Sequence, residues 1–176
     1  TVPRCALPIE WRVNLLVPKL GMMADPGAIA EGFRATAPGT VVIDRDLIAP
    51  HLTDWRGRAH GDAALLLRPG SAEEVSAILR TAAAQGLAVV PQGGRTGLVG
   101  GGLPEPGRRS VLLSLERMAR IRSVDVPGRT MVSEAGVVLE AVHAAAAAVG
   151  LRFPLSLAAK GSATVGGLVS TNAGGV

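Results

Sequence analysis

Residues 65–104 read LLLRPGSAEEVSAILRTAAAQGLAVVPQGGRTGLVGGGLP and place an amphipathic segment between two short apolar runs. Short runs such as 63–67 and 87–90, bounded by turn residues, are typical of buried strands. Ser71 and Glu74 have the spacing of a capping box, and the apolar residues after them recur at the period of a helix. We therefore predict a βαβ unit whose two strands are parallel.

The remaining residues indicate a mixed fold of class α+β. Asp25 and Pro26 form a helix-start signal before residues 27–36. Further on we expect a strand at 111–115, a hairpin formed by 121–126 and 130–135, a helix at 137–149 and a glycine-punctuated tail. The order predicts a βαβ subdomain followed by a mixed α/β subdomain.

Composition narrows the class of protein. The 176 residues are 48% hydrophobic, which is too apolar for disorder, and only 2% aromatic, which is too poor in rings for binding single-stranded nucleic acid. The net charge of +4 comes from scattered basic residues, so we expect no nucleic-acid partner. No apolar stretch is long enough for a membrane span.

Cysteine and histidine usage points away from a metal site. The single cysteine, Cys5, excludes an internal disulfide. His51, His60 and His143 are far apart in the sequence and are interpreted as surface or packing residues, with His143 on a helix surface. We expect no metal.

The segment PQGGRTGLVGGGLP (91–104) follows the second predicted strand, at the sheet edge where α/β folds bind ligands. Glycines permit positive φ and close backbone approach, so successive N–H groups can form a nest for a pyrophosphate. Thr96 adds a hydroxyl donor and Arg95 a positive charge. The chain contains neither G-x-G-x-x-G nor a P-loop motif, and a plain glycine loop is the alternative.

A second glycine-rich segment covers residues 160–175 and interleaves glycines with Ser, Thr and Asn. Hydroxyl and amide groups beside exposed backbone suit a polar ring or a ribose, and Lys160 offers a cation for a phosphate. From composition alone, a flexible tail is the alternative.

Together, the two segments resemble the flavin-binding domain of the vanillyl-alcohol oxidase / p-cresol methylhydroxylase superfamily, the PCMH type. The pairing of PQGGRTGLVGG with PLSLAAKGS and TNAGG resembles the branch of D-2-hydroxyglutarate dehydrogenase, D-lactate dehydrogenase and the glycolate oxidase FAD subunit. The resemblance covers roughly residues 40–176.

The resemblance implies FAD as the cofactor, with the first segment around its pyrophosphate and the second along the flavin and ribitol. Relatives with covalent flavin carry a His where this chain has Thr96, so we expect noncovalent FAD. The cofactor-binding residues that it implies are Pro91, Gln92, Gly93, Gly94, Arg95, Thr96, Gly97, Leu98, Gly161, Ser162, Val165, Gly166, Gly167, Thr171, Asn172, Ala173, Gly174 and Gly175.

For the intact protein, the resemblance implies an FAD-dependent oxidoreductase acting on CH–OH groups. Its substrate would be a D-2-hydroxy acid of the 2-hydroxyglutarate, lactate or glycolate type, and a separate electron acceptor would reoxidise the flavin. The alternative is a non-catalytic flavin- or nucleotide-binding subunit of a larger oxidoreductase complex. We expect a cytoplasmic protein, or one peripheral to the inner membrane, with a homodimer as one option.

The expected domain boundaries follow from the same resemblance. Residues 1–37 are an N-terminal extension and helix, with the native start at Met22 or Met23, and 38–176 form an FAD-binding domain that is incomplete at its C-terminus. The substrate domain, which would supply the catalytic and any metal-binding residues, is absent from this chain. We therefore assign no catalytic residue and expect the fragment alone to be inactive.

Overall fold

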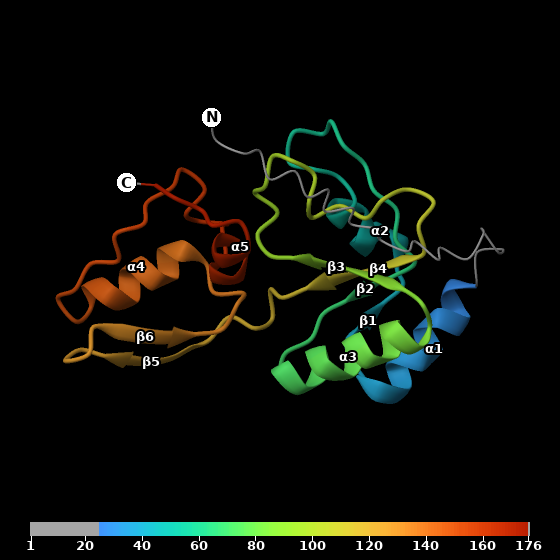
Figure 1. Ribbon diagram of the computed structural model, residues 1–176, viewed down its shortest axis with the longest axis horizontal. Coiled ribbons are helices and arrows are strands. Elements are labelled where there is room, and N and C mark those ends of the chain that lie inside the picture. Colours follow the sequence, from blue (N-terminus) through green and yellow to red (C-terminus); the bar gives the residue numbers. More distant parts are fainter. Residues whose placement is uncertain (1–24, 176) are drawn as a thin grey trace, which may run out of the picture.

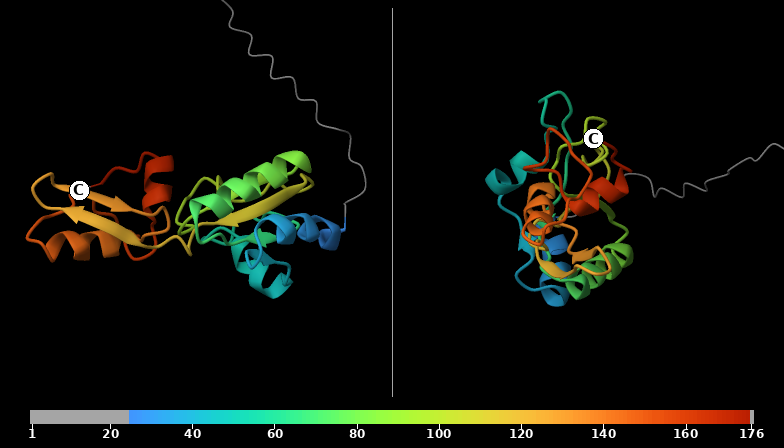
Figure 2. Two further views of the ribbon diagram at one scale, coloured as in Figure 1. Left: turned by 90° about the horizontal axis from the view of Figure 1, so that it is seen from below. Right: turned by 90° about the vertical axis from the view of Figure 1, so that its left-hand side faces the viewer.

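The computed structural model describes residues 25–175, which form two lobes in succession along the chain (Figures 1 and 2). The predicted start at Met22 or Met23 lies outside the described residues. The first lobe contains α1 (Pro26–Thr36), β1 (Val41–Val42), α2 (Arg45–Ile48), the 3₁₀ helix η1 (Ala49–His51), β2 (Leu66–Leu67), α3 (Ala72–Ala84), β3 (Ala88–Gln92) and β4 (Ser110–Ser114). The second contains β5 (Ile121–Asp125), β6 (Thr130–Ser133), α4 (Leu139–Ala147) and α5 (Val165–Ser170).

The first lobe is built on a four-stranded sheet of order β1-β2-β4-β3. β2 and β3 both run parallel to β4, which confirms the predicted parallel βαβ unit. β4 lies between the two strands of that unit, and β1 pairs antiparallel with β2 at one edge. The carboxyl ends of β2, β3 and β4 therefore meet at one edge of the sheet.

Both faces of this sheet are covered by helices (Figure 1). Leu65, Leu67 and residues of α1 and α3 form a buried cluster on one face, and Leu66 packs with Leu112 and Ile48 of α2 on the other. Because successive side chains of a strand point to opposite faces, a strand covered on both sides is apolar throughout. This burial explains the uninterrupted run that predicted β2.

Local signals define the ends of α3. The Glu74 N–H donates to Ser71 Oγ at 3.2 Å, as the capping box predicts. The Glu74 carboxylate accepts from the Gly70 N–H at 2.6 Å instead of closing back on Ser71. Gly86 follows the helix at φ +63°, a left-handed conformation that glycine adopts without strain.

The second lobe begins with the predicted hairpin, β5–β6, whose strands pair antiparallel. Glu134 follows β6 and is buried. Its carboxylate accepts from the backbone N–H of Arg120 at 2.9 Å and from the guanidinium groups of Arg120 and Arg122. These bonds, chiefly those from the Arg120 side chain, lower the pKa of Glu134 to about 2. The ionised carboxylate thus holds the base of the hairpin.

Two sequence interpretations of this lobe need correction. The glycine-punctuated tail contains the helix α5, held at its start by bonds from Val165 N to Val137 O at 2.9 Å and from Gly166 N to Ala135 O at 2.8 Å. His143 is half-buried: its Nε2 lies 2.7 Å from the Leu155 carbonyl oxygen, and its ring packs against Phe153. Among the described residues, no helix is both long and apolar enough to cross a membrane.

Candidate functional site

The two glycine-rich segments lie against each other between the lobes. The first leaves β3 at the carboxyl edge of the sheet, and the residues leading into α5 pack on it (Figure 1). A Cβ placed on Gly93 would contact Thr164 Oγ1. One placed on Gly94 would overlap the Ser162 carbonyl group and lie 3.2 Å from the Ala163 nitrogen. Glycine at both positions is what lets the two backbones come this close.

A row of free backbone donors runs along the first segment. No N–H group from residue 93 to residue 102 donates a hydrogen bond to another described residue. Exposed N–H groups in succession are the donors that phosphate oxygens accept from in anion nests. The N–H groups of this loop are therefore available to a ligand.

The residues of this loop that adopt a left-handed backbone conformation are not the glycines at its start. Arg95 has φ +55° and Gly100 has φ +73°, whereas Gly93 and Gly94 are outside the left-handed region. The expectation that glycines here supply positive φ is therefore wrong for Gly93 and Gly94, which are needed for close approach. Arg95 is exposed and forms no ion pair with a described residue.

Thr164 was not among the predicted site residues, yet it lies where the segments meet. The residue is only 5% exposed, and its Oγ1 has no hydrogen-bond partner among residues 25–175. A buried polar atom without a partner carries a free-energy penalty that a bound ligand or water can remove. Its burial follows from the contact with Gly93, which no local sequence pattern reveals.

Pro91 and Gln92 belong to β3, and the Gln92 side chain is buried. Gln92 is 4% exposed; its Nε2 donates to the carbonyl oxygens of His51 at 2.8 Å and of Gly102 at 2.6 Å. Its Oε1 lies 2.8 Å from His51 Nδ1. His51 is thus a packing histidine, and burial is the main cause that lowers its pKa.

The second segment divides into two parts. Residues 161–167 reach the first loop, and the Gly167 nitrogen lies 3.8 Å from where a Gly93 Cβ would be. Gly166 serves packing as well, because a Cβ there would lie 2.9 Å from that of Ala135. Residues 171–175 follow the far end of α5, where Gly175 packs on Ser156 and Leu157. The structure therefore brings residues 161–167, but not residues 171–175, to the first glycine loop.

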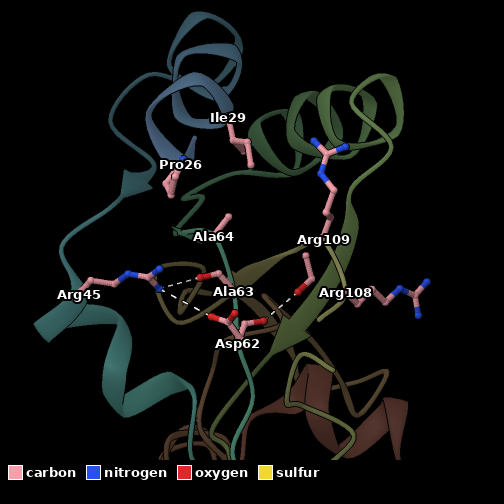
Figure 3. Close-up of a pocket in the computed structure, with 9 residues that line it drawn as sticks. Pro26, Ile29, Arg45, Asp62, Ala63, Ala64, Arg108 and Arg109 are labelled. Carbon is pink, nitrogen blue, oxygen red and sulfur yellow. Dashed lines mark hydrogen bonds and ion pairs between the residues drawn. The ribbon is translucent and has the colours of Figure 1, made fainter. Parts of the chain in front are cut away.

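A separate cavity of about 30 Å³ lies near the start of β4, at the opposite edge of the parallel strands (Figure 3). Arg45 reaches the Ala63 carbonyl oxygen at 3.0 Å and Asp62 at 4.0 Å, while Arg108 and Arg109 point in other directions. These guanidinium groups do not converge on one anion. No group of three metal-ligating side chains occurs in the part of the chain that the structure describes.

The residues present fit a dinucleotide. The row of free N–H groups matches the acceptor oxygens of a pyrophosphate, the unpartnered Thr164 hydroxyl lies beside it, and Gly93 and Gly94 keep the two backbones together. A pyrophosphate held by backbone dipoles does not need a lysine-bearing P-loop.

Comparison with known proteins agrees with this geometry. Residues 63–176 match the family model described as an FAD binding domain. D-2-hydroxyglutarate dehydrogenase of Xanthomonas citri pv. viticola is 46% identical over 123 residues, covering 70% of this chain and 26% of that protein. The mitochondrial D-2-hydroxyglutarate dehydrogenase of Danio rerio is 42% identical over 144 residues, covering 82% of this chain and 27% of that protein.

A solved structure of alkyldihydroxyacetonephosphate synthase shares the fold, with a TM-score of 0.75 and 21% identity over 85% of this chain and 30% of that one. The chain spans about a quarter of the length of the two D-2-hydroxyglutarate dehydrogenases. The predicted fold class and the resemblance to PCMH-type flavoproteins are confirmed. The chain belongs to the FAD-binding domain family.

Proposed function

We propose that this chain is the FAD-binding part of a flavin-dependent dehydrogenase that oxidises a D-2-hydroxy acid to the 2-oxo acid. The observation that carries the proposal is the meeting of two glycine segments at a loop with free N–H groups from 93 to 102. Relatives that are 46% and 42% identical are named D-2-hydroxyglutarate dehydrogenase. A non-catalytic flavin-binding subunit is not favoured, because these relatives are named as enzymes.

In this proposal the chain's own residues bind and orient the cofactor. The N–H groups after Gln92 donate to the pyrophosphate, Arg95 adds a positive charge beside it, and Thr164 gains a partner for its hydroxyl. FAD, when bound, accepts the two electrons removed from the hydroxy acid. The predicted cofactor residues of the second segment, 161–162, 165–167 and 171–175, line the rest of the FAD molecule.

Several finer expectations belong to the same proposal. FAD is held noncovalently, since Thr96 has no nucleophilic ring nitrogen for a flavin link. The FAD-binding domain begins near residue 38, although α1, which precedes it, packs into the same core through Phe33. The substrate domain, the electron acceptor, a homodimer and a cytoplasmic or membrane-peripheral location are proposed for the whole protein. Cell fractionation and size-exclusion chromatography test the last two.

The test uses the full-length protein purified from its gene. We expect it to carry FAD that acid precipitation releases into the supernatant, and the flavin absorbance to bleach on anaerobic addition of a D-2-hydroxy acid. D-2-hydroxyglutarate, D-lactate and glycolate are compared, with the L-enantiomers of the first two as controls. A colourless protein that stays colourless after incubation with FAD refutes the proposal. Bound flavin that none of these acids reduces supports the non-catalytic alternative.

A further inference from the structure

We propose that Gln92 and His51 form a clamp that keeps the glycine loop (residues 93–102) in its ligand-binding conformation, which makes both of them positioning residues. The link to FAD affinity rests on the proposed function; the effect on the loop itself does not. Neither side chain is expected to touch the cofactor. The clamp acts through the backbone that it holds.

The hydrogen bonds of the clamp fix every polar atom of the Gln92 amide. Both Nε2 hydrogens are used, one on the His51 carbonyl and one on the Gly102 carbonyl. A flipped amide would aim Oε1 at two carbonyl oxygens, so Oε1 must be the atom that faces His51 Nδ1. His51 Nδ1 therefore carries a proton and donates it to Gln92.

The clamp joins the two ends of the loop. Gln92 precedes the first loop residue, and its side chain holds the carbonyl group of the last one, Gly102. Just beyond, Leu103 N donates to Gly100 O at 2.9 Å and Asp62 N donates to Pro104 O at 3.3 Å. Both ends of the loop are thus anchored, whereas the backbone of residues 93–99 forms no hydrogen bond with another described residue.

With the clamp, the conformational entropy of the loop is lost when the protein folds, before the ligand binds. A loop without internal hydrogen bonds samples many conformations unless its ends are held, and a ligand that must order it binds more weakly. The clamp restricts the loop before the ligand arrives. Because Gln92 and His51 are buried and use none of the N–H groups of residues 93–102, they do this without taking up the donors offered to a ligand.

The experiment compares variants of the full-length protein, first without FAD. Gln92→Met keeps the length of the side chain and removes its hydrogen bonds. Gln85→Met is the matched control, because the Gln85 side chain makes no hydrogen bond to a described residue. The readout is the rate of tryptic cleavage after Arg95, relative to cleavage after Arg129 in the exposed β5–β6 turn of the same molecule.

We expect Gln92→Met to raise the relative cleavage rate at Arg95 about tenfold and to raise the Kd for FAD about tenfold, the size expected when the one hydrogen bond that reaches the loop, from Gln92 Nε2 to the Gly102 carbonyl, is lost. Gln85→Met should match the wild type in both measurements. A relative cleavage rate that stays at the wild-type value in a folded Gln92→Met variant overturns the clamp.

A pair of His51 variants separates positioning from general destabilisation. His51→Leu removes the donor to Gln92, whereas His51→Asn replaces Nδ1 with an amide nitrogen at a similar distance from the backbone. We expect increased Arg95 cleavage in His51→Leu and near wild-type cleavage and FAD affinity in His51→Asn. Equal cleavage in the two variants overturns the role of His51, even if Gln92→Met does not fold.

The two proposals can fail separately. If the wild type binds no FAD while Gln92→Met still opens the loop, the proposed function fails and the clamp stands. If the wild type binds FAD and Gln92→Met changes neither cleavage nor Kd, the clamp fails and the proposed function stands.

Discussion

Gly94→Ala tests the contact on which the site is built. The added Cβ would lie 2.5 Å from the Ser162 carbonyl carbon and 3.2 Å from the Ala163 nitrogen, where ordinary contacts are 3.4–4 Å. Both neighbours are backbone atoms, so no side chain can rotate away. The carbonyl oxygen of Ser162 would lie closer still, so the two segments must separate by more than 1 Å, and changes of this kind typically cost about 1–3 kcal/mol.

This cost translates into two measurable effects. For a cooperative unit of 150–250 residues it lowers the thermal midpoint by roughly 2–12 °C. If FAD binding requires the segments to return to their original positions, the Kd for FAD rises by between about fivefold and 150-fold. Both are measured on the full-length protein, by differential scanning fluorimetry and by flavin fluorescence titration.

Gly97→Ala is the matched control for stability. Gly97 lies in the same loop, its φ is outside the left-handed region, and a Cβ there would meet no atom within 4 Å. We expect its thermal midpoint to stay close to that of the wild type. A Gly94→Ala variant that is as stable as Gly97→Ala and binds FAD like the wild type would refute the close packing of the two segments.

Three further predictions concern charge and packing around the site. Arg95→Asn removes the charge, and asparagine tolerates the φ of +55° at this position. The Kd for FAD should therefore rise several-fold at low salt and approach the wild-type value as salt is added. A difference in Kd that does not depend on salt contradicts the role of Arg95 beside a phosphate. Because the pKa of Glu134 is lowered to about 2 from 4.5, its stabilisation is present above about pH 4.5 and is lost as the pH falls toward 2. The stability difference between wild type and Glu134→Gln should therefore shrink over that range in acid-unfolding curves, and a constant difference contradicts the ion-pair account. His143→Ala should lower the thermal midpoint, by loss of the contact with Leu155 and Phe153, while the Kd for FAD stays within about twofold; a large loss of FAD affinity would place His143 in the site.

The parts of the fold that sequence predicts are those with local causes. Ser71 and Glu74 start α3 through bonds within one helical turn, and the apolar run before them is a strand covered on both faces. The position of β4 between β2 and β3 depends on pairing between distant strands, which periodicity does not encode. α5 contains two glycines and forms because Ala135 and Val137 accept its first N–H groups.

In the site, too, sequence identified the features with local causes but not those that depend on contacts between distant residues. Glycine content and spacing identified both segments, and the resemblance assigned them to one cofactor. The specific roles required three-dimensional contacts: Gly94 is fixed by the proximity of Ser162, Thr164 is buried by Gly93, and Gln92 turns inward to His51. Glycine patterns indicate where backbone is accessible, but they do not distinguish a glycine needed for φ from one needed for contact.

Amide hydrogen exchange on the full-length protein tests the central claim most directly, because it reports on the backbone N–H groups proposed to bind the pyrophosphate. The account predicts fast exchange across residues 93–99 without FAD and strong protection of the same residues when FAD is added. FAD binding that leaves these amides unprotected, with protection confined to other parts of the protein, would contradict it.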